Sequence, residues 1–511
     1  APGMARNIKH IKNKPFQIIS DQPAPFIKDY PVLVIDDEVD NASVDTKEQT
    51  YSDEESPDPN YKPTTINRLI RQLLNIFEKK AYVGYTATPF ANIFINDRGH
   101  TKNEGPDLFP KNFIVDLPVP ENHSGLENLF SPEILSEGEI YDEELEKMSQ
   151  FKLIKDSSLD PNDMWCASGW LPPTHNKEHI PATGNNNERI PKSLRRAILS
   201  FLITSLVRNW RGEIHSHKTM LIHVTRFTDV QKEIQKQVQE EIEDFREIMN
   251  QDNQDKKNIY FNELNEIYKN DFLKFADDHP EKLWPKPEQI LDEKHLKMIL
   301  NQVGENVKCL NRKTEKGEDL DYEEYKRNHG AGICTIVIGG DKLSRGLTLE
   351  GLSISYFLRS AKHPMYDTLM QMGRWFGYRQ EYIDLCKIYT TSNIIGWFFK
   401  ISAATKRFRE LIQWMSVLNK TPTEFGLYVE DDPILTITSK TKMRHSFEKD
   451  TSFSGSGHDF TTLKRDKKIL DKNAAVVKNF LGNCGKPHAN GKLKNGFQNY
   501  ENTYQWRDVP S

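Results

Sequence analysis

The chain has 511 residues, of which 37% are hydrophobic and 28% are charged, and its formal net charge is −5. This length allows roughly two to four domains with ample cores. The negative net charge excludes a globally basic surface of the kind that indicates nucleic-acid binding. A locally basic channel is still compatible with a negative net charge.

Cysteine usage and hydropathy exclude further classes of protein. The five cysteines are scattered and form no Cys-x-x-Cys pair, so we expect neither a disulfide framework nor a structural zinc site. No run of about 18 apolar residues is present, and the N-terminus lacks the pattern of a signal peptide. We therefore expect a soluble, cytoplasmic protein.

The first predicted strand is the most informative element. Apolar residues 32–35 run directly into the acidic stretch 36–40. This order places carboxylates at the carboxyl edge of a sheet, where open α/β sheets bind their ligands. In ATP-hydrolysing folds, the first Asp there holds magnesium and the following Glu orients the attacking water. The alternative is a strand that simply leads into an acidic, solvent-exposed loop.

A helix and a second strand follow this acidic stretch. Thr64 or Thr65 is predicted to cap a helix with apolar residues on one face, namely Ile66, Leu69, Ile70, Leu73, Leu74 and Phe77. With a strand at 81–85, this pattern predicts a right-handed parallel crossover unit. Directly afterwards, Thr86 and Thr88 provide hydroxyls that can bond to neighbouring carboxylates. A plain strand-to-turn transition is the alternative.

Further along the chain, an irregular segment precedes a second α/β pattern. Residues 96–190 are rich in Pro, Asn and Glu, and are expected to form long connections with small elements. The charged, helical segment 228–302 is expected to be an insertion with a solvated face. The predicted strands lie at 220–224, 335–338, 353–358 and 385–390. The predicted helices lie at 194–210, 366–376 and 394–418.

Two segments of this second pattern carry residues suited to phosphate. Gly340, Asp341 and Arg345 follow a strand in a loop whose glycines let backbone amides approach an anion, although turns of this composition are common. Arg374 and Arg379 close a helix and could stabilise charge on a transferring phosphoryl group. For Arg379, a helix cap or a pair with surface acids is an equal alternative.

In this order, the segments resemble the motifs of superfamily 2 helicases and translocases. Asp-Glu-Val-Asp at 37–40 is similar to the Walker B box, and Thr-Ala-Thr at 86–88 to the Ser/Thr-Ala-Thr motif. Ser-Arg-Gly-Leu at 344–347 is similar to the fifth motif, and Gly-Arg at 373–374 to the sixth.

Longer stretches of sequence make the resemblance specific to the Z-one (Z1) domain family. The members of this family are bacterial and archaeal, are associated with helicases, and are described as endonucleases. The stretches span 35–43, 85–92, 107–110, 223–227, 343–351 and 366–379. The resemblance covers most of residues 31–430.

The resemblance implies an α/β fold of two RecA-like parallel-sheet domains with helical insertions. It also implies ATP and magnesium as cofactors, DNA as a partner, and partner proteins in a bacterial restriction or defence system. The expected organisation is a first RecA-like part at 1–95, a linker at 96–190, a second RecA-like domain at 191–430 and an extension at 431–511.

The resemblance also implies roles for individual residues. Asp37 would bind magnesium and Glu38 would activate water, while Arg374, with Arg379 as the alternative, would stabilise the transferring phosphoryl group. The expected cofactor-binding residues are Asp37, Gly340, Asp341 and Arg345. The expected coupling residues are Thr86, Thr88 and Gln371.

The sequence departs from superfamily 2 in two ways. Gln371 lies two positions before Gly373 rather than three, and Arg379 follows Arg374 by five positions rather than three. No Gly-x-x-x-x-Gly-Lys-Ser/Thr phosphate loop occurs in the chain. Because residues 1–31 are too few for that loop and its strands, we expect the first ATPase domain to be truncated, and this fragment to be inactive.

Two other functions remain alternatives to an ATP-dependent motor, namely a non-catalytic binding module and a magnesium-dependent endonuclease. Glu324 and Lys326 have nuclease-like Glu-x-Lys spacing, and His175 and His179 fit a zinc pattern, but chance accounts for both better. Aromatic residues recur at helical spacing, which favours interior packing over base stacking. They are Trp375, Phe376, Trp397, Phe398 and Trp414.

Overall fold

The computed structural model divides the chain into two compact units, Ala1–Ser446 and Phe447–Ser511. The structure describes residues 27–47, 61–101, 103–131, 142–156, 170–172, 175–182, 188–311, 320–340, 348–359, 364–429, 435–443, 446, 467–483, 488–490 and 503–505. The second unit contains α16 (Lys467–Asn483) and a hairpin of β13 (His488–Asn490) and β14 (Thr503–Gln505).

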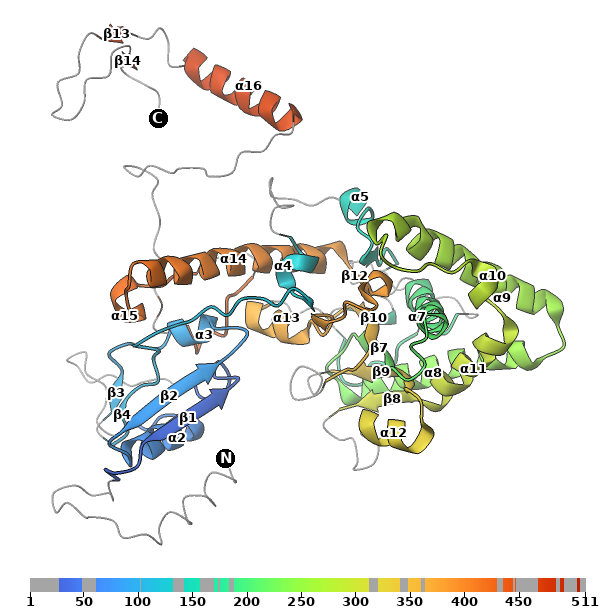
Figure 1. The fold of residues 1–511 in the computed structure, drawn as a ribbon, viewed down its shortest axis with the longest axis horizontal. Coiled ribbons are helices and arrows are strands. Elements are labelled where there is room, and N and C mark those ends of the chain that lie inside the picture. Colours follow the sequence, from blue (N-terminus) through green and yellow to red (C-terminus); the bar gives the residue numbers. More distant parts are fainter. Residues whose placement is uncertain are drawn as a thin grey trace. The chain divides into compact units, whose positions relative to one another are not determined.

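The main element of the first unit is a six-stranded parallel sheet in the order β6-β12-β10-β7-β9-β8 (Figure 1). Its strands are β6 (Phe151–Leu153), β7 (Lys218–His223), β8 (Val307–Leu310), β9 (Cys334–Gly339), β10 (Leu352–Phe357) and β12 (Lys387–Thr390). Every residue of the four central strands is buried. This burial is typical of parallel sheets covered on both faces, and the predicted α/β class is confirmed.

Helices cover both faces of this sheet. One core packs alternate strand residues such as Met220 and Ile336 against α7 (Lys192–Trp210), α8 (Thr228–Asn250), α9 (Gln254–Ile267) and α11 (Glu293–Glu305). On the opposite face, Leu221 and Val337 pack near α12 (Tyr322–His329). Phe357 packs with α13 (Tyr366–Met372) and α14 (Ser392–Val417).

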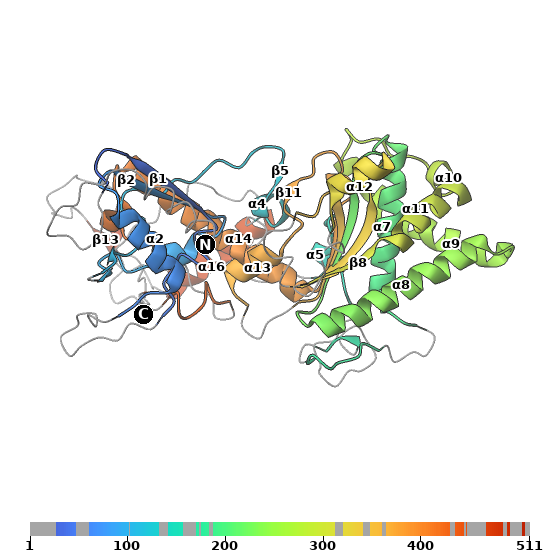
Figure 2. The same cartoon turned by 90° about the horizontal axis from the view of Figure 1, so that it is seen from below.

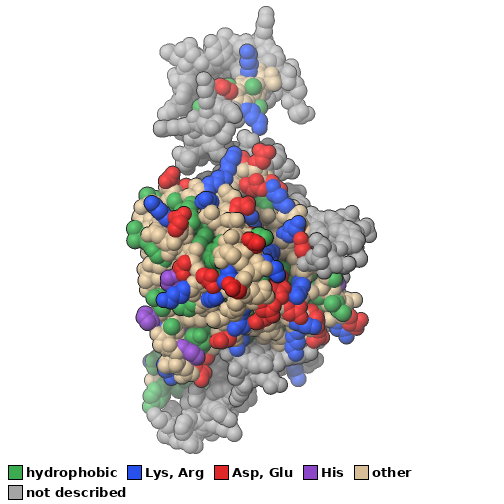
Figure 3. All heavy atoms as spheres, turned by 90° about the vertical axis from the view of Figure 1, so that its right-hand side faces the viewer, with side chains coloured by type: hydrophobic (Ala, Val, Ile, Leu, Met, Phe, Trp, Pro, Cys, Tyr) green, Lys and Arg blue, Asp and Glu red, His purple; other side chains and the backbone are tan. Residues whose placement is uncertain are grey.

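The four strands and the main helices predicted for this region are present within a few residues. The predicted helix at 366–376 ends earlier, at Met372, because Gly373 leaves the helical conformation. Strands β6 and β8 were not predicted, since they have only three and four residues and each contains a lysine. Figure 3 shows acidic and basic side chains interspersed on the face at the right of Figure 1, which fits a solvated surface.

The predicted parallel crossover unit is confirmed. β1 (Val32–Asp37) pairs in parallel with β2 (Lys80–Tyr85), and α2 (Thr65–Asn75) connects them. They form a separate two-stranded sheet, and α13 is drawn between this sheet and the larger one (Figures 1 and 2).

The predicted apolar face of α2 is only partly buried. Ile70 is buried, but Ile66 and Leu69 are 39% and 42% exposed, whereas Asn67 and Arg71 are buried. Arg71 donates to the hydroxyl of Thr101 at 2.9 Å and lies 3.8 Å from the carboxylate of Asp107. A polar cluster therefore takes the place of the expected hydrophobic contact.

Several short elements are also present in the described part of the first unit. The remaining strands are β3 (His100–Thr101), β4 (Gly105–Pro106), β5 (His123–Ser124) and β11 (Gly377–Tyr378). The remaining helical segments are α3 (Phe90–Ile93), α4 (Leu126–Leu129), α5 (Asp142–Leu145), η2 (Tyr268–Phe272), η3 (Leu273–Asp278), α10 (Pro287–Ile290), η5 (Ile383–Leu385) and α15 (Pro422–Phe425). None of the helices in the described part of the chain is long and apolar enough to cross a membrane.

Candidate functional site

The acidic end of β1 divides into residues with different environments. The side chain of Asp36 is hydrogen-bonded within the small sheet formed by β1 and β2. Its carboxylate accepts hydrogen bonds from the hydroxyls of Tyr82, at 2.6 Å, and Ser43. Burial and the neighbouring Asp36 raise the pKa of Tyr82 strongly, which keeps the phenol protonated as a donor. Asp36 therefore stabilises the fold.

Asp37 and Glu38 are exposed where the strand ends. The Oδ1 atom of Asp37 accepts a hydrogen bond from the backbone N–H of Glu38 at 3.0 Å. Glu38 has a φ of 56°, in the left-handed region that residues other than glycine rarely adopt. Strained backbone of this kind often occurs at functional sites, where the surrounding structure holds it.

Asp40 is the centre of the site. Its side chain is fully buried and accepts hydrogen bonds from the hydroxyls of Thr86 at 2.8 Å and Thr88 at 3.1 Å. The side-chain amide of Gln371, on α13, donates to the same carboxylate at 3.4 Å. The structure thus brings Thr86, Thr88 and Gln371 together, and Asp40 is the residue that joins them.

A lysine from the segment after α15 completes this connection. The ammonium of Lys442 donates to the backbone carbonyl of Asp40 at 2.7 Å and lies 3.7 Å from the carboxylate of Asp367. Thr438 donates to that same carboxylate at 2.7 Å. Lys442 was not predicted from the sequence, because a lone lysine in a polar segment forms no pattern by which to find it.

The two arginines after α13 have different surroundings. Burial and the nearby Arg379 lower the pKa of Arg374, whereas the charge of Glu38 raises it, so Arg374 lies within electrostatic reach of Glu38. Arg379 is buried and donates to several backbone carbonyls, including that of Trp375 at 2.7 Å. Its other partners are the carbonyls of Leu352, Arg374 and Phe376 and the hydroxyl of Tyr382. These bonds hold the backbone after α13 in place, which favours the structural alternative for Arg379.

Gly340 follows β9 at the carboxyl edge of the large sheet and is buried. A Cβ atom there would lie 2.4 Å from the Nε2 atom of Gln231 and 2.9 Å from the carbonyl oxygen of Thr225, so only glycine fits. Asp341 and Arg345 lie outside the described residues. None of the contacts found in the described part of the chain joins Gly340 to the acidic end of β1.

Asp37 and Glu38 suit a magnesium ion. Magnesium in phosphate-transfer sites is held by one or two carboxylates together with phosphates and water, not by a full protein cage. Asp37 offers an exposed carboxylate with a single hydrogen bond to its Oδ1 atom among the described residues. Nowhere in the described ranges do three His, Cys, Asp or Glu residues form a group able to hold a metal.

The histidines of the possible zinc pattern make structural contacts, whereas the residues of the possible nuclease pattern lie on the surface. His175 donates to the carbonyl of Pro172 and accepts from the hydroxyl of Thr225, each at 2.7 Å, and burial lowers its pKa. Glu324 and Lys326 are exposed on α12, where Asp321 caps the helix by accepting from the backbone N–H of Glu324.

Most of the recurring aromatic residues belong to the core. Trp375 is 5% exposed, Phe398 is fully buried, and Phe376 and Trp397 pack against the same core. Trp414 differs, since it is 67% exposed. Interior packing is thus confirmed for this group, apart from Trp414.

A comparison with protein families finds one match. Residues 193–436 match the family model described as Z1 domain. The matched part includes Gln371 and Arg374 but not the acidic end of β1 or the two threonines after β2. No curated protein and no solved structure matches the chain.

Proposed function

This chain carries a Z1 domain over residues 193–436, and on that premise we propose that it is an ATP-dependent, nucleic-acid-acting module of the superfamily 2 helicase type. In this proposal β1, α2 and β2 belong to one RecA-like domain, and the six-stranded sheet forms a second. DNA is the proposed partner, in a bacterial restriction or defence system.

The observation that carries the proposal is the set of hydrogen bonds to Asp40. Two threonines after β2 and a glutamine on α13 converge on one buried carboxylate that lies two residues after the exposed Glu38. A movement of α13 relative to β1 must change these bonds. The arrangement could therefore link events at the acidic strand end to the larger sheet.

The individual roles follow from exposure and charge. Asp37 would hold magnesium, which supplies positive charge to neutralise the phosphates. Glu38 would orient the attacking water from its exposed position beside Asp37. Arg374, within electrostatic reach of Glu38, would stabilise charge on the transferring phosphoryl group.

A second candidate function is binding of nucleic acid or protein without turnover. The observation that favours it is the absence of a phosphate-loop motif from the sequence. Such a module would keep the contacts around Asp40 as structure and would bind its partner without nucleotide hydrolysis.

The substitution Glu38→Gln tests the catalytic proposal. It removes the carboxylate that would activate water but retains the side-chain shape, so nucleic-acid-stimulated ATP hydrolysis should fall at least about 100-fold. Nucleotide affinity should stay unchanged. Hydrolysis is measured by phosphate release, and binding by fluorescence of a labelled nucleotide, in the gene product that contains this chain.

The control is Glu324→Gln, an equivalent change on the exposed face of α12, which should leave hydrolysis unaltered. Unchanged turnover in Glu38→Gln would reject the role of Glu38. Partner binding by a wild-type protein that hydrolyses no ATP would favour the second candidate.

A further inference from the structure

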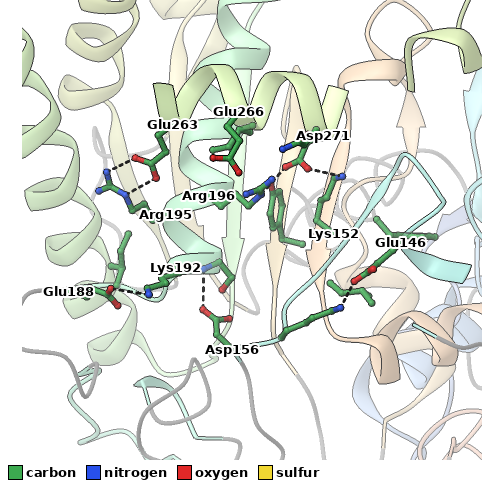
Figure 4. A pocket seen from close by; sticks show the side chains of 18 of the residues that line it. Glu146, Lys152, Asp156, Glu188, Lys192, Arg195, Arg196, Glu263, Glu266 and Asp271 are labelled. Atoms are coloured by element: carbon green, nitrogen blue, oxygen red, sulfur yellow. Dashed lines mark hydrogen bonds and ion pairs between the residues drawn. The ribbon is translucent and has the colours of Figure 1, made fainter. Parts of the chain in front are cut away.

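A cavity of about 970 Å³ lies away from the candidate site (Figure 4). Its walls come from β6, β12, α7, α8, α9, η2, η3 and the adjoining segments, none of which contributes a residue to the contacts around Asp40. Many of its charged residues are paired with one another, as Arg195 is with Glu241 and Glu263.

One end of the cavity has an excess of positive charge. Asp271 lies between the ammonium of Lys152, at 3.0 Å, and the guanidinium of Arg196, at 2.9 Å (Figure 4). The ammonium groups of Lys152 and Lys274 lie 5.1 Å and 5.4 Å from the centre of the same ring, that of Phe275. Three cations thus gather near Asp271, and Glu266, which lines the same cavity, also acts on Arg196.

The surroundings disfavour the charge of Lys152, whereas the hydrogen bond to Asp271 raises the pKa of Arg196. The side chain of Lys152 is only 15% exposed, so its charge is poorly screened by water. Burial, together with repulsion from Arg196 and Lys274, lowers the pKa of Lys152 in spite of the neighbouring Asp271. A bound anion would relieve this repulsion.

The backbone is irregular at the same place. The π-helix η2 follows α9 directly and contains Asp271, and η3 has a break at Phe275, where φ is −108° and ψ is 15°. π-Helical turns inside helices frequently occur at functional sites. The irregularity here brings Asp271, Lys274 and Phe275 to one end of the cavity.

The rest of the cavity indicates a ligand larger than inorganic phosphate. Apolar side chains, including Ile190 and Ile267, form part of the wall. On another side, Asp156 accepts a hydrogen bond from the backbone N–H of Ser193 through Oδ2, while its buried Oδ1 atom has no partner among the described residues. A ligand hydroxyl could donate to that oxygen.

We propose that this cavity binds a small organic phosphate monoester that carries hydroxyl groups, of the sugar-phosphate class. The phosphate contacts Lys152, Arg196 and Lys274, and the carbon skeleton extends along the apolar wall. The site is separate from the function proposed above and does not depend on it.

Calorimetric titration with ribose 5-phosphate, inorganic phosphate and ribose tests this proposal. Ribose 5-phosphate should bind more tightly than inorganic phosphate, and ribose should not bind. Lys152→Met and Lys274→Met should each weaken the binding of ribose 5-phosphate about 10- to 100-fold, because each removes a charge-assisted contact. Lys274 is exposed, so its substitution leaves the fold intact.

The matched control is Lys155→Met. Lys155 lines the same cavity but pairs with Glu146 and is 63% exposed, so its loss should change the affinity less than about twofold. Absence of binding by the wild-type protein, or an equal loss in the control variant, would overturn the proposal. Displacement of ribose 5-phosphate by a single-stranded oligonucleotide would also overturn it, because the cations would then bind the phosphates of a nucleic acid.

Discussion

At the scale of single residues, four acidic side chains within five positions have three different environments. Asp36 is bonded within the small sheet, Asp37 and Glu38 face solvent, and Asp40 is buried among donors. Sequence adjacency therefore says little about role. What separates these residues is the local backbone: Asp36 lies within β1 beside Tyr82, whereas the chain leaves the strand at Glu38, where φ is 56°, before it reaches Asp40.

Substitution of Asp40 by asparagine should destabilise the protein. An amide puts a donor where two threonine hydroxyls and Gln371 all donate, so the free energy of unfolding should fall by about 1–3 kcal/mol. Urea unfolding followed by circular dichroism measures the change. The same substitution at exposed Asp37 should change stability by less than about 0.5 kcal/mol. Equal effects at the two positions would contradict the central role of Asp40.

At the scale of elements, the crossover unit depends on a close approach between β2 and the residue after Glu38. A Cβ atom on Gly84 would lie 2.8–2.9 Å from three atoms of the Val39 side chain. Gly84 is the register partner of Asp36, so this contact fixes the chain just beyond the acidic strand end. Glycine is required there for space.

Gly84→Ala should therefore lower the free energy of unfolding by about 1–3 kcal/mol through overpacking. Val39→Ala should recover part of that loss in the double variant, since it removes the two Cγ atoms that clash but keeps the Cβ atom of residue 39. A double-mutant cycle on urea unfolding measures the coupling. If the two substitutions changed the free energy of unfolding additively, the contact between Gly84 and Val39 would not be what requires glycine at this position.

Buried lysines begin two of the strands in the large sheet. Lys387, at the start of β12, donates to the carbonyl of Asp384 at 3.1 Å, and burial lowers its pKa to about 8. Burial likewise lowers the pKa of Lys218, at the start of β7, to about 8. The hydrogen bonds found for both ammonium groups in the described part of the chain go to backbone carbonyls, which makes their charge unfavourable in the folded state.

The stability of the protein should consequently depend on pH between about 8 and 9.5. An unfolded lysine has an ordinary pKa of about 10.4, so in this interval the unfolded chain binds more protons, and the free energy of unfolding rises with pH. Lys387→Met should reduce this slope in urea unfolding at a series of pH values. Lys177→Met, at an exposed position, should not. An unchanged slope in Lys387→Met would contradict the assignment.

At the scale of the whole first unit, distant segments meet around Asp40. Gln371 and Lys442 lie 331 and 402 residues from Asp40 in sequence, yet both bond to it. Lys442 also lies close to Asp367 at the start of α13. The small sheet, α13 and the segment 435–443 are therefore held by one polar network.

Lys442→Met should weaken this network. It leaves the Asp40 carbonyl without its charged donor and should lower the free energy of unfolding by about 1–2 kcal/mol. Hydrogen exchange should also show faster opening of β1 and β2. The matched control is Lys440→Met, since Lys440 is exposed two residues away. Equal exchange rates in the two variants would show that Lys442 does not hold the small sheet.

Elements with a long, periodic pattern could be predicted from the amino-acid sequence alone. The strand at 32–35, the crossover to 81–85 and the central strands of the large sheet are all present, because continuous apolar runs bounded by polar turns have few alternatives. The local sequence also located the acidic strand end and the two threonines that follow β2. It further identified the family whose model residues 193–436 match.

Which of these residues come into contact depends on the three-dimensional fold and could not be predicted from the sequence. The short edge strands β6 and β8 form by pairing with neighbours, so three or four residues carry too little pattern to predict them. Asp40 as the common acceptor, Lys442 as its distant partner and the cations around Asp271 likewise depend on contacts between segments far apart in the chain. The periodicity of hydrophobic side chains indicates which face of an element is buried. Which distant residues contact that face is set by the packing of the elements.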